Sequence, residues 1–132
     1  MRPKEGLVSM KAAPMSLLDT TQISLESAMR GSMLRQSLLT NNLANVDTPG
    51  YQREDVNFQG TLQSALSAGQ SPADVQFSPQ VQAGTVAADG NGVGGEQDSA
   101  DLAENGLLYQ DLTSVAAQRE QILITAIGPQ GS

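Results

Sequence analysis

The sequence has no cysteine, histidine or tryptophan among its 132 residues, and aromatic residues make up only 3% of it. Without cysteine there can be no disulfide framework. Without cysteine or histidine, zinc sites of the usual sulfur and nitrogen type cannot form. Scarce aromatic residues argue against a large globular core, and the length allows one domain at most. No run approaches the roughly 18 apolar residues of a membrane span, and no cleavable signal peptide is visible.

Positive charge is also scarce, and the formal net charge is −7. Nucleic acids and anionic membrane surfaces attract basic patches, so neither is an expected partner. Residues 89–100 contain a glycine-rich turn, but Val93 and Ala100 occupy positions where a calcium loop needs oxygen ligands. Glu54 and Asp55 would point to opposite faces of an extended segment. We therefore expect no catalytic residue, no metal, no cofactor and no small-molecule substrate.

Two long segments carry apolar residues at the alternating spacing of four and three that is typical of helices packed along one another. One runs from about residue 18 to 46 and the other from about 99 to 127. The fold class expected is mainly α, with long N- and C-terminal helices forming a coiled-coil-like pair. A plain amphipathic helix on a small core fits the same spacing equally well. The predicted helix contacts are Leu25, Met29, Leu39, Leu43, Leu108, Leu112, Val115, Ile122 and Ala126.

The remaining segments have weaker patterns. Residues 59–98 are rich in Gly, Ser and Gln, which predicts a flexible, irregular middle. Within it we expect helical turns at 62–66 and a small hairpin between 75–77 and 81–86, after a short strand at 54–58. Residues 1–14 show no periodicity, so they are either a disordered tail or upstream sequence before a misassigned start. Translation could begin at Met1, Met10 or Met15.

The first helical segment ends in a predicted tight turn. Pro49 presets φ for the first central position, and Gly50 accepts the positive φ that a type II turn needs at the second. Thr48 precedes the proline and is therefore disfavoured in the α region. The helix should thus end near residues 45–47, with an extended segment following up to residue 58.

The residues around this turn form a long motif. The run from Asn41 to Tyr51 resembles the N-terminal signature of bacterial flagellar axial proteins, the rod, hook and hook-associated subunits. The matching positions are Asn42, Asn45, Thr48, Pro49, Gly50 and Tyr51. A second run, residues 89–110, is similar to the signature of the proximal rod subunits in that family. Its matching positions are Asp89, Gly90, Asn91, Val93, Leu102, Ala103, Glu104, Asn105, Leu107, Tyr109 and Gln110.

The second run departs from the family pattern at Gly95 and Ser99, where larger apolar residues are usual. The first turn of the C-terminal helix is therefore the part that the resemblance supports least. Asp98 or Ser99 is the expected N-cap of that helix.

The resemblance implies a structural protein rather than an enzyme. It would be a subunit of the proximal rod in the bacterial flagellar basal body, stacking into a tube that serves as drive shaft and export channel. It would be exported to the cell envelope by the flagellar type III apparatus. Its partners would be copies of itself, other rod proteins and the small membrane-ring/rod junction protein. Another rod subunit remains an alternative, as does a cytosolic coiled-coil adaptor or chaperone, which would explain the helices but not the turn.

Overall fold

The computed structural model describes the backbone of residues 3–82 and 94–128. Within those ranges it describes side chains from residue 19 onward. Its elements, in chain order, are α1 (Pro3–Ala44), β1 (Glu54–Asp55), α2 (Phe58–Ser67), the 3₁₀ turn η1 (Pro72–Asp74), β2 (Gln80–Val81) and α3 (Gly94–Ile127). None of the described helices is long and apolar enough to cross a membrane.

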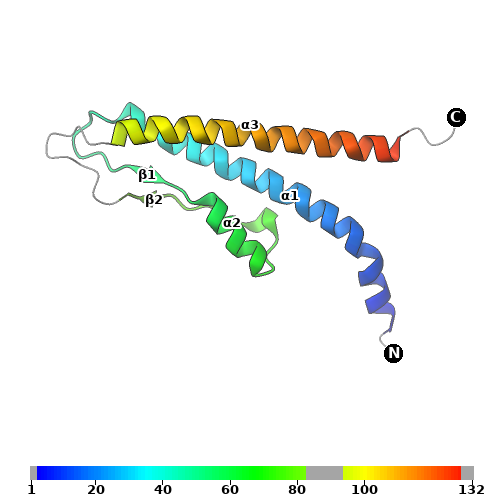
Figure 1. Cartoon of the computed structure of the whole chain (residues 1–132). Helices are drawn as coiled ribbons and strands as arrows, with labels where there is room; N and C mark the ends of the chain where they lie inside the picture. The colour runs from blue at the N-terminus through cyan, green and yellow to red at the C-terminus, as the bar shows by residue number, and fades with distance from the viewer. Residues whose placement is uncertain (1–2, 83–93, 129–132) are drawn as a thin grey trace.

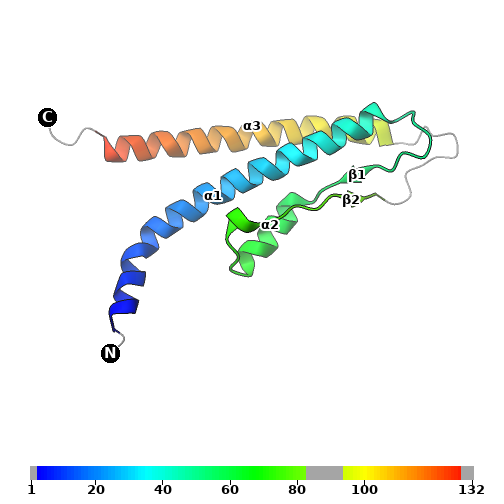
Figure 2. The ribbon, with the colours of Figure 1, turned by 180° about the vertical axis from the view of Figure 1, so that it is seen from behind.

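The two long helices run antiparallel and are in contact along only part of their length. Figures 1 and 2 show the cyan end of α1 beside the yellow start of α3, and the blue end of α1 turning away from the orange and red part of α3. The most extensive packing between elements is between α1 and α3, and α2 and η1 pack on α1 from another side. The predicted fold class, mainly α with a pair of long terminal helices, is confirmed.

The N-terminal helix begins at Pro3 rather than near residue 18, so residues 3–14 lie within it. That they are a tail or upstream sequence stays a prediction. Proline suits the first turn of a helix, where its missing N–H would have no partner. Lysines, alanines and leucine follow it, and these are good helix formers. Pro14 removes one backbone hydrogen bond within the helix, and α1 bends in this blue part (Figure 1). The position of the translation start stays open.

The C-terminal helix begins at Gly94, not at Ser99. Asp98 and Ser99 therefore lie inside the helix and are not its N-caps. The Ser99 hydroxyl donates to the carbonyl of Gly95 at 2.9 Å, an ordinary contact within a helix. The helix ends at Ile127, directly before Gly128, as the sequence predicted.

A two-stranded antiparallel sheet connects the middle of the chain to the turn, with Glu54 opposite Val81 and Asp55 opposite Gln80. The strand expected at 54–58 is thus shorter. Its partner is β2, so the hairpin predicted between 75–77 and 81–86 is wrong for the described residues, and residues 83–86 lie outside them. Val75 is instead buried to 1% exposure in the core, and its N–H donates to the carbonyl of Pro72 at 3.4 Å.

The core lies between α1, α2 and the segment after η1. Leu62, Ala65 and Val75 form its buried cluster, with Ala28 and Phe77 packed against it. The predicted turns at 62–66 are part of the longer helix α2, which begins after Asn57, whose side chain accepts from the N–H of Gly60 at 3.0 Å. The middle of the chain thus holds more regular structure than its composition suggested.

One glycine determines how closely α2 approaches α1. A Cβ built on Gly31 would lie 2.5 Å from the Cβ of Phe58. Phe58 in turn meets Phe77 edge to face, with ring centroids 6.2 Å apart. Gly31 is therefore required for the packing of the Phe58 ring, although a glycine inside a helix costs about 1 kcal/mol relative to alanine.

Candidate functional site

The motif turn has the predicted geometry. The N–H of Tyr51 donates to the carbonyl of Thr48 at 3.2 Å, and Gly50 has φ of +77°. Proline at the first central position and a positive φ at the second are the features of a type II turn. Thr48, Pro49 and Gly50 are exposed and Tyr51 is half-buried. The turn therefore presents its outer face to the surroundings of the subunit.

Asn42 joins the helix to the extended segment beyond the turn. Its amide nitrogen donates to the carbonyl of Glu54 at 2.8 Å, and its amide oxygen accepts from the N–H of Glu54 at 3.0 Å. The side chain is 1% exposed. A primary amide presents one donor and one acceptor side by side, so Asn42 pairs with the backbone of β1 as a neighbouring strand would.

Asn45 holds the helix exit. Its amide nitrogen donates to the carbonyl of Asn41 at 2.8 Å, and its amide oxygen accepts from the Thr48 hydroxyl at 3.2 Å. The N–H of Thr48 donates to the carbonyl of Asn45 at 2.9 Å. The spacing of asparagines and threonine in the motif thus has a local cause: each polar side chain satisfies backbone or side-chain groups freed where the helix stops.

An ion pair ties the segment after the turn to the start of α3. The Arg53 guanidinium donates from Nε to Oδ2 of Asp98 at 2.9 Å and contacts its Oδ1 through a second nitrogen. Asp98 is fully buried. The hydrogen bond to Asp98 raises the pKa of Arg53 above its ordinary value, against the opposing effect of burial. A Cβ on Gly94 would lie 2.8 Å from Cδ of Arg53, so that glycine leaves room for the arginine.

A second ion pair lies close to the first. Arg35 of α1 donates to both carboxylate oxygens of Asp55, at 2.9 and 3.1 Å. Its other charged neighbour is Asp101 of α3, with a nitrogen–oxygen distance of 3.7 Å. The hydrogen bond to Asp55 is the largest influence that raises the pKa of Arg35. Two arginines thus link α1, β1 and α3 where the end of α1 lies beside the start of α3. We call this region, which includes Ser32, Asn42, Asp98 and Asn105, the base of the helix pair.

Asn105 occupies the centre of the contact between the long helices. Its amide nitrogen donates to the carbonyl of Ser32 at 2.9 Å and to Oε1 of Gln36 at 2.8 Å. Its amide oxygen accepts from the Ser32 hydroxyl at 3.2 Å. Asn105 and Ser32 are both buried, at 1% and 0% exposure. A buried asparagine with specific partners fixes helix register more than it adds stability.

The structure separates the predicted helix contacts into two groups. Leu39 is buried, and Leu25, Met29, Leu108 and Leu112 are half-buried. Others are exposed: Leu43 at 37%, Val115 at 44%, Ile122 at 65%, and Ala126. Of the motif residues in the second run, Leu102 and Tyr109 are half-buried and Leu107 is 64% exposed. Asn91 lies outside the described residues.

Burial along α3 follows the alternating spacing through residues that are partly polar. The covered residues are Asp98, Leu102, Asn105, Tyr109, Leu112, Ala116, Arg119 and Leu123. Two of the first three are polar, so an apolar pattern alone does not identify them. Val115, Ile122 and Ala126 are exposed in the single subunit, and their role as helix contacts stays a prediction.

Sequence reasoning missed the ion pairs of Arg35 and Arg53. One signal was available: with three of the seven basic residues near the N-terminus, only four remain, and two of these flank the motif turn. Asp98 and Asp101 are spaced to share one face of a helix. Among the described residues, no group of three or more acidic side chains could hold a metal ion.

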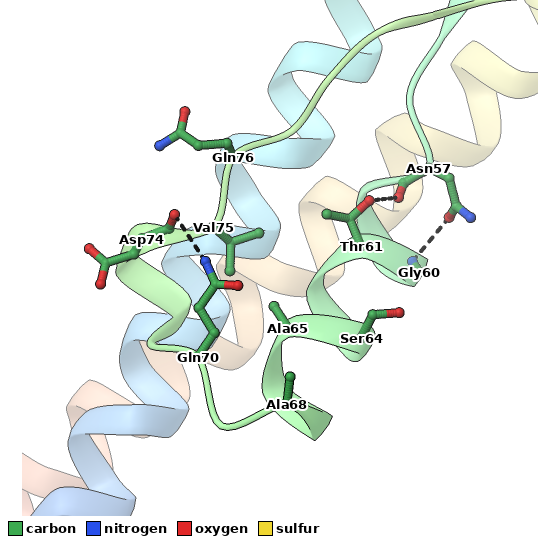
Figure 3. Close-up of a pocket in the computed structure, with 10 residues that line it drawn as sticks. All are labelled: Asn57, Gly60, Thr61, Ser64, Ala65, Ala68, Gln70, Asp74, Val75 and Gln76. Atoms are coloured by element: carbon green, nitrogen blue, oxygen red, sulfur yellow. Dashed lines mark hydrogen bonds between the residues drawn. The ribbon is translucent and has the colours of Figure 1, made fainter.

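An open pocket of about 740 Å³ lies between α2 and the segment around η1 (Figure 3). Its labelled side chains are mostly small or amides, and some of their polar atoms are engaged locally. Gln70 donates to the carbonyl of Asp74 at 3.3 Å, and the Thr61 hydroxyl donates to the carbonyl of Asn57 at 2.8 Å. Of the ten labelled residues only Asp74 carries a charge, so the pocket offers no acid–base pair.

Comparison with known proteins agrees with the motif. Residues 24–52 match the family described as "Flagella basal body rod protein". The chain is 32% identical over 110 residues to the flagellar basal body rod protein FlgB of Bacillus subtilis (strain 168), covering 74% of this chain and 85% of that protein. It is 30% identical over 122 residues to the FlgB of Salmonella typhimurium, covering 76% and 88%.

The chain belongs to the FlgB family. The FlgB protein of Yersinia enterocolitica is also similar, 30% identical over 105 residues that cover 64% of this chain and 77% of that protein. The region matched to the rod family, residues 24–52, contains Asn42, which pairs with the backbone of β1. It also contains Asn45 at the end of the helix and the turn from Thr48 to Tyr51. The family is one of structural rod proteins, and its signature coincides in this chain with the joint between the long helices.

Proposed function

We propose that this protein is a structural subunit of the flagellar rod that polymerises through its helices into the tubular shaft of the basal body. Membership of the FlgB family supports the rod assignment. Polymerisation is supported by exposed apolar side chains in the distal part of α3, residues 115–127. There Val115, Ile122, Ile124 and Ile127 are 44%, 65%, 56% and 74% exposed.

These exposures support an interaction surface on this part of α3. Single exposed apolar residues are ordinary, but several on one exposed part of a helix mark an interaction site. In Figures 1 and 2 this part of α3 extends beyond the region where α1 accompanies it, and α2 lies away from it. Helices of adjacent subunits in a stacked tube would cover these side chains.

We further infer where the subunit lies in the rod and which proteins it contacts. The resemblance of residues 89–110 supports a proximal position in the rod, next to other rod proteins and to the membrane-ring/rod junction protein. Export by the flagellar type III apparatus fits a subunit that acts outside the cytoplasm. A non-catalytic role fits the described pocket, which lacks paired titratable groups.

Ile122→Asp tests polymerisation. The side chain is 65% exposed in the single subunit, so its replacement should change the stability of the monomer by no more than about 0.5 kcal/mol. In the assembly the same change would bury an unpaired charge at each repeated contact, at a cost of several kcal/mol. We expect secretion of the subunit to persist while basal bodies and motility are lost.

The matched control is Ser99→Asp, which places the same charge at an exposed polar position near the start of α3, outside the proposed surface. It should assemble and support swimming. Intact basal bodies that contain Ile122→Asp subunits would contradict polymerisation through this surface. Loss of assembly with both variants would show that added charge, rather than position, is responsible.

A further inference from the structure

An apolar groove of about 330 Å³ lies between α2 and α3, with α1 beneath it. Phe58 and Ala28 contribute to it, Leu62 and Leu66 line it from α2, and Leu108 and Leu112 line it from α3. Its remaining lining residues are Gln59, Gln63 and Ser67, so none of the nine carries a charge. Leu66 is 39% exposed. The groove is thus apolar, open and bordered by neutral side chains.

The C-terminal end of α3 has a matching character. From Gln121 to Gly128 the sequence holds no charged residue. Ile122, Ile124 and Ile127 in this segment are each more than half exposed. We call residues 121–128 the tip of α3. The tip thus combines exposed isoleucine side chains with an absence of charged residues.

The tip cannot reach the groove of its own chain. The groove is lined by Leu108 and Leu112 of the same continuous helix, and residues between them and the tip remain helical to Ile127. A helix rises about 1.5 Å per residue, so it carries its own end away from this region. Figure 1 shows the orange and red part of α3 extending away from α2. An occupant of the groove from this protein must therefore come from another copy.

Charge restricts where two copies can meet. Each copy carries a net charge of −7, so approach of two copies is generally repulsive. Contacts between neutral surfaces avoid the close juxtaposition of like charges and allow apolar burial. The groove and the tip are both neutral and both apolar, and each offers the other a cover for exposed leucine or isoleucine side chains.

We propose that the tip of α3 of one copy docks into the groove between α2 and α3 of a second copy. The two surfaces are different parts of the molecule, so the contact is heterologous and leaves a free groove at one end and a free tip at the other. Such a contact propagates into a chain of subunits. The proposal rests on the proposed function and specifies which surfaces of the rod subunit meet.

Cysteine cross-linking tests the contact, since the chain has no cysteine of its own. One tagged copy carries Leu66→Cys at the groove and a second, differently tagged copy carries Ile127→Cys at the tip. Both are expressed together, basal bodies are isolated and a short flexible bis-maleimide is added. Such a reagent tolerates more separation than the Cα distance of about 7 Å that limits a disulfide. The product is detected by its two tags.

The matched control replaces Leu66→Cys by Met33→Cys, at an apolar position of α1 that is 59% exposed and outside the groove. We expect the groove–tip pair to give at least about tenfold more product than the control pair, because contact raises the effective concentration of the second thiol. Equal yields from basal bodies that contain both copies would overturn the proposal. If Ile127→Cys lowers incorporation, Ile124→Cys takes its place at the tip.

Two further arms separate this contact from other possibilities. Preferential linking of Leu66→Cys to Val8→Cys would assign the groove to the N-terminal end of a second copy and overturn the tip assignment. The same pairs are also cross-linked as purified full-length chains at high concentration. A selective groove–tip product there, without this protein in basal bodies, would support the contact and contradict the rod function.

Discussion

The base of the helix pair and the distal part of α3 are built in opposite ways. At the base, the residues buried between elements include Ser32, Asn42, Asp98 and Asn105, which are polar and hydrogen-bonded. In the distal part the exposed residues include valine and three isoleucines. An ordinary small domain buries its apolar side chains and exposes its polar ones. Here four of the residues buried at the base are polar, beside apolar ones such as Leu39, while apolar side chains of distal α3 stay exposed.

The contrast indicates that the base fixes the fold of the subunit and that distal α3 serves assembly. Buried hydrogen-bonded polar groups contribute little net stability, but they penalise any other register because their partners would be lost. Exposed apolar side chains contribute nothing to the single subunit and become favourable when another surface covers them. Polar contacts thus fix how the long helices pack within the subunit. The exposed apolar side chains of distal α3 remain available for burial on assembly.

The largest effect at the base is expected from Arg53→Ala. It would leave the carboxylate of Asp98, which is fully buried, without its cation, at a cost of about 3–5 kcal/mol in the free energy of unfolding. Urea denaturation of the purified chain measures this. Adding Asp98→Ala to Arg53→Ala should recover part of the loss, since the unpaired charge is then gone. A loss below about 1 kcal/mol would show that water replaces the arginine.

A smaller effect, about 1–3 kcal/mol, is expected where α2 meets α1. Gly31→Ala places a Cβ 2.5 Å from that of Phe58, which must move. Gly106→Ala is the matched control in α3, because nothing lies within 4 Å of its added Cβ. The control should be neutral or stabilising by up to about 1 kcal/mol, since alanine is the better helix former. Equal unfolding free energies for the two variants would contradict the close approach.

The cost of replacing Gly50 in the turn should depend on how readily the new residue adopts a positive φ. Gly50 has φ of +77° and no atom near an added Cβ, so only conformational strain opposes substitution. Gly50→Val should cost about 1–3 kcal/mol locally and impair incorporation into basal bodies. Gly50→Asn should cost less, since asparagine adopts positive φ more readily. Motility assays with both variants check the order, and equal swimming would show that the shape of the turn is unimportant.

The smallest effect is expected from alkaline pH. Hydrogen bonds to Asp55 and Asp98 raise the pKa of Arg35 and Arg53, respectively, above their ordinary values. A group whose pKa is raised on folding stabilises the fold fully below its unfolded pKa, and this contribution is lost only as pH rises through the folded value. The coupling energy between Arg53 and Asp98 in a double-mutant cycle should therefore be equal at about pH 7 and pH 10. A decrease at pH 10 would contradict the assignment.

The sequence predicted most of the architecture because its strongest patterns are local. The two helical segments follow from apolar spacing, and the turn from Pro49 and Gly50, whose backbone preferences need no tertiary context. The burial of Asp98 and Asn105 within α3 was not predicted, because a hydrophobic pattern excludes polar residues from buried positions. Their burial depends on Arg53 and Ser32, which are distant in sequence, so no local rule could identify them.

The distal part of α3 is, in our proposal, an interface left open in the single subunit. A high-resolution map of the assembled basal body with this chain traced tests it most directly. We expect Ile122, Ile124 and Ile127 to be covered by a neighbouring chain. The contacts of Asn42, Asp98 and Asn105 should be retained within the subunit. Isoleucine side chains facing solvent in the assembled rod, or a base whose polar contacts have been exchanged between subunits, would contradict it.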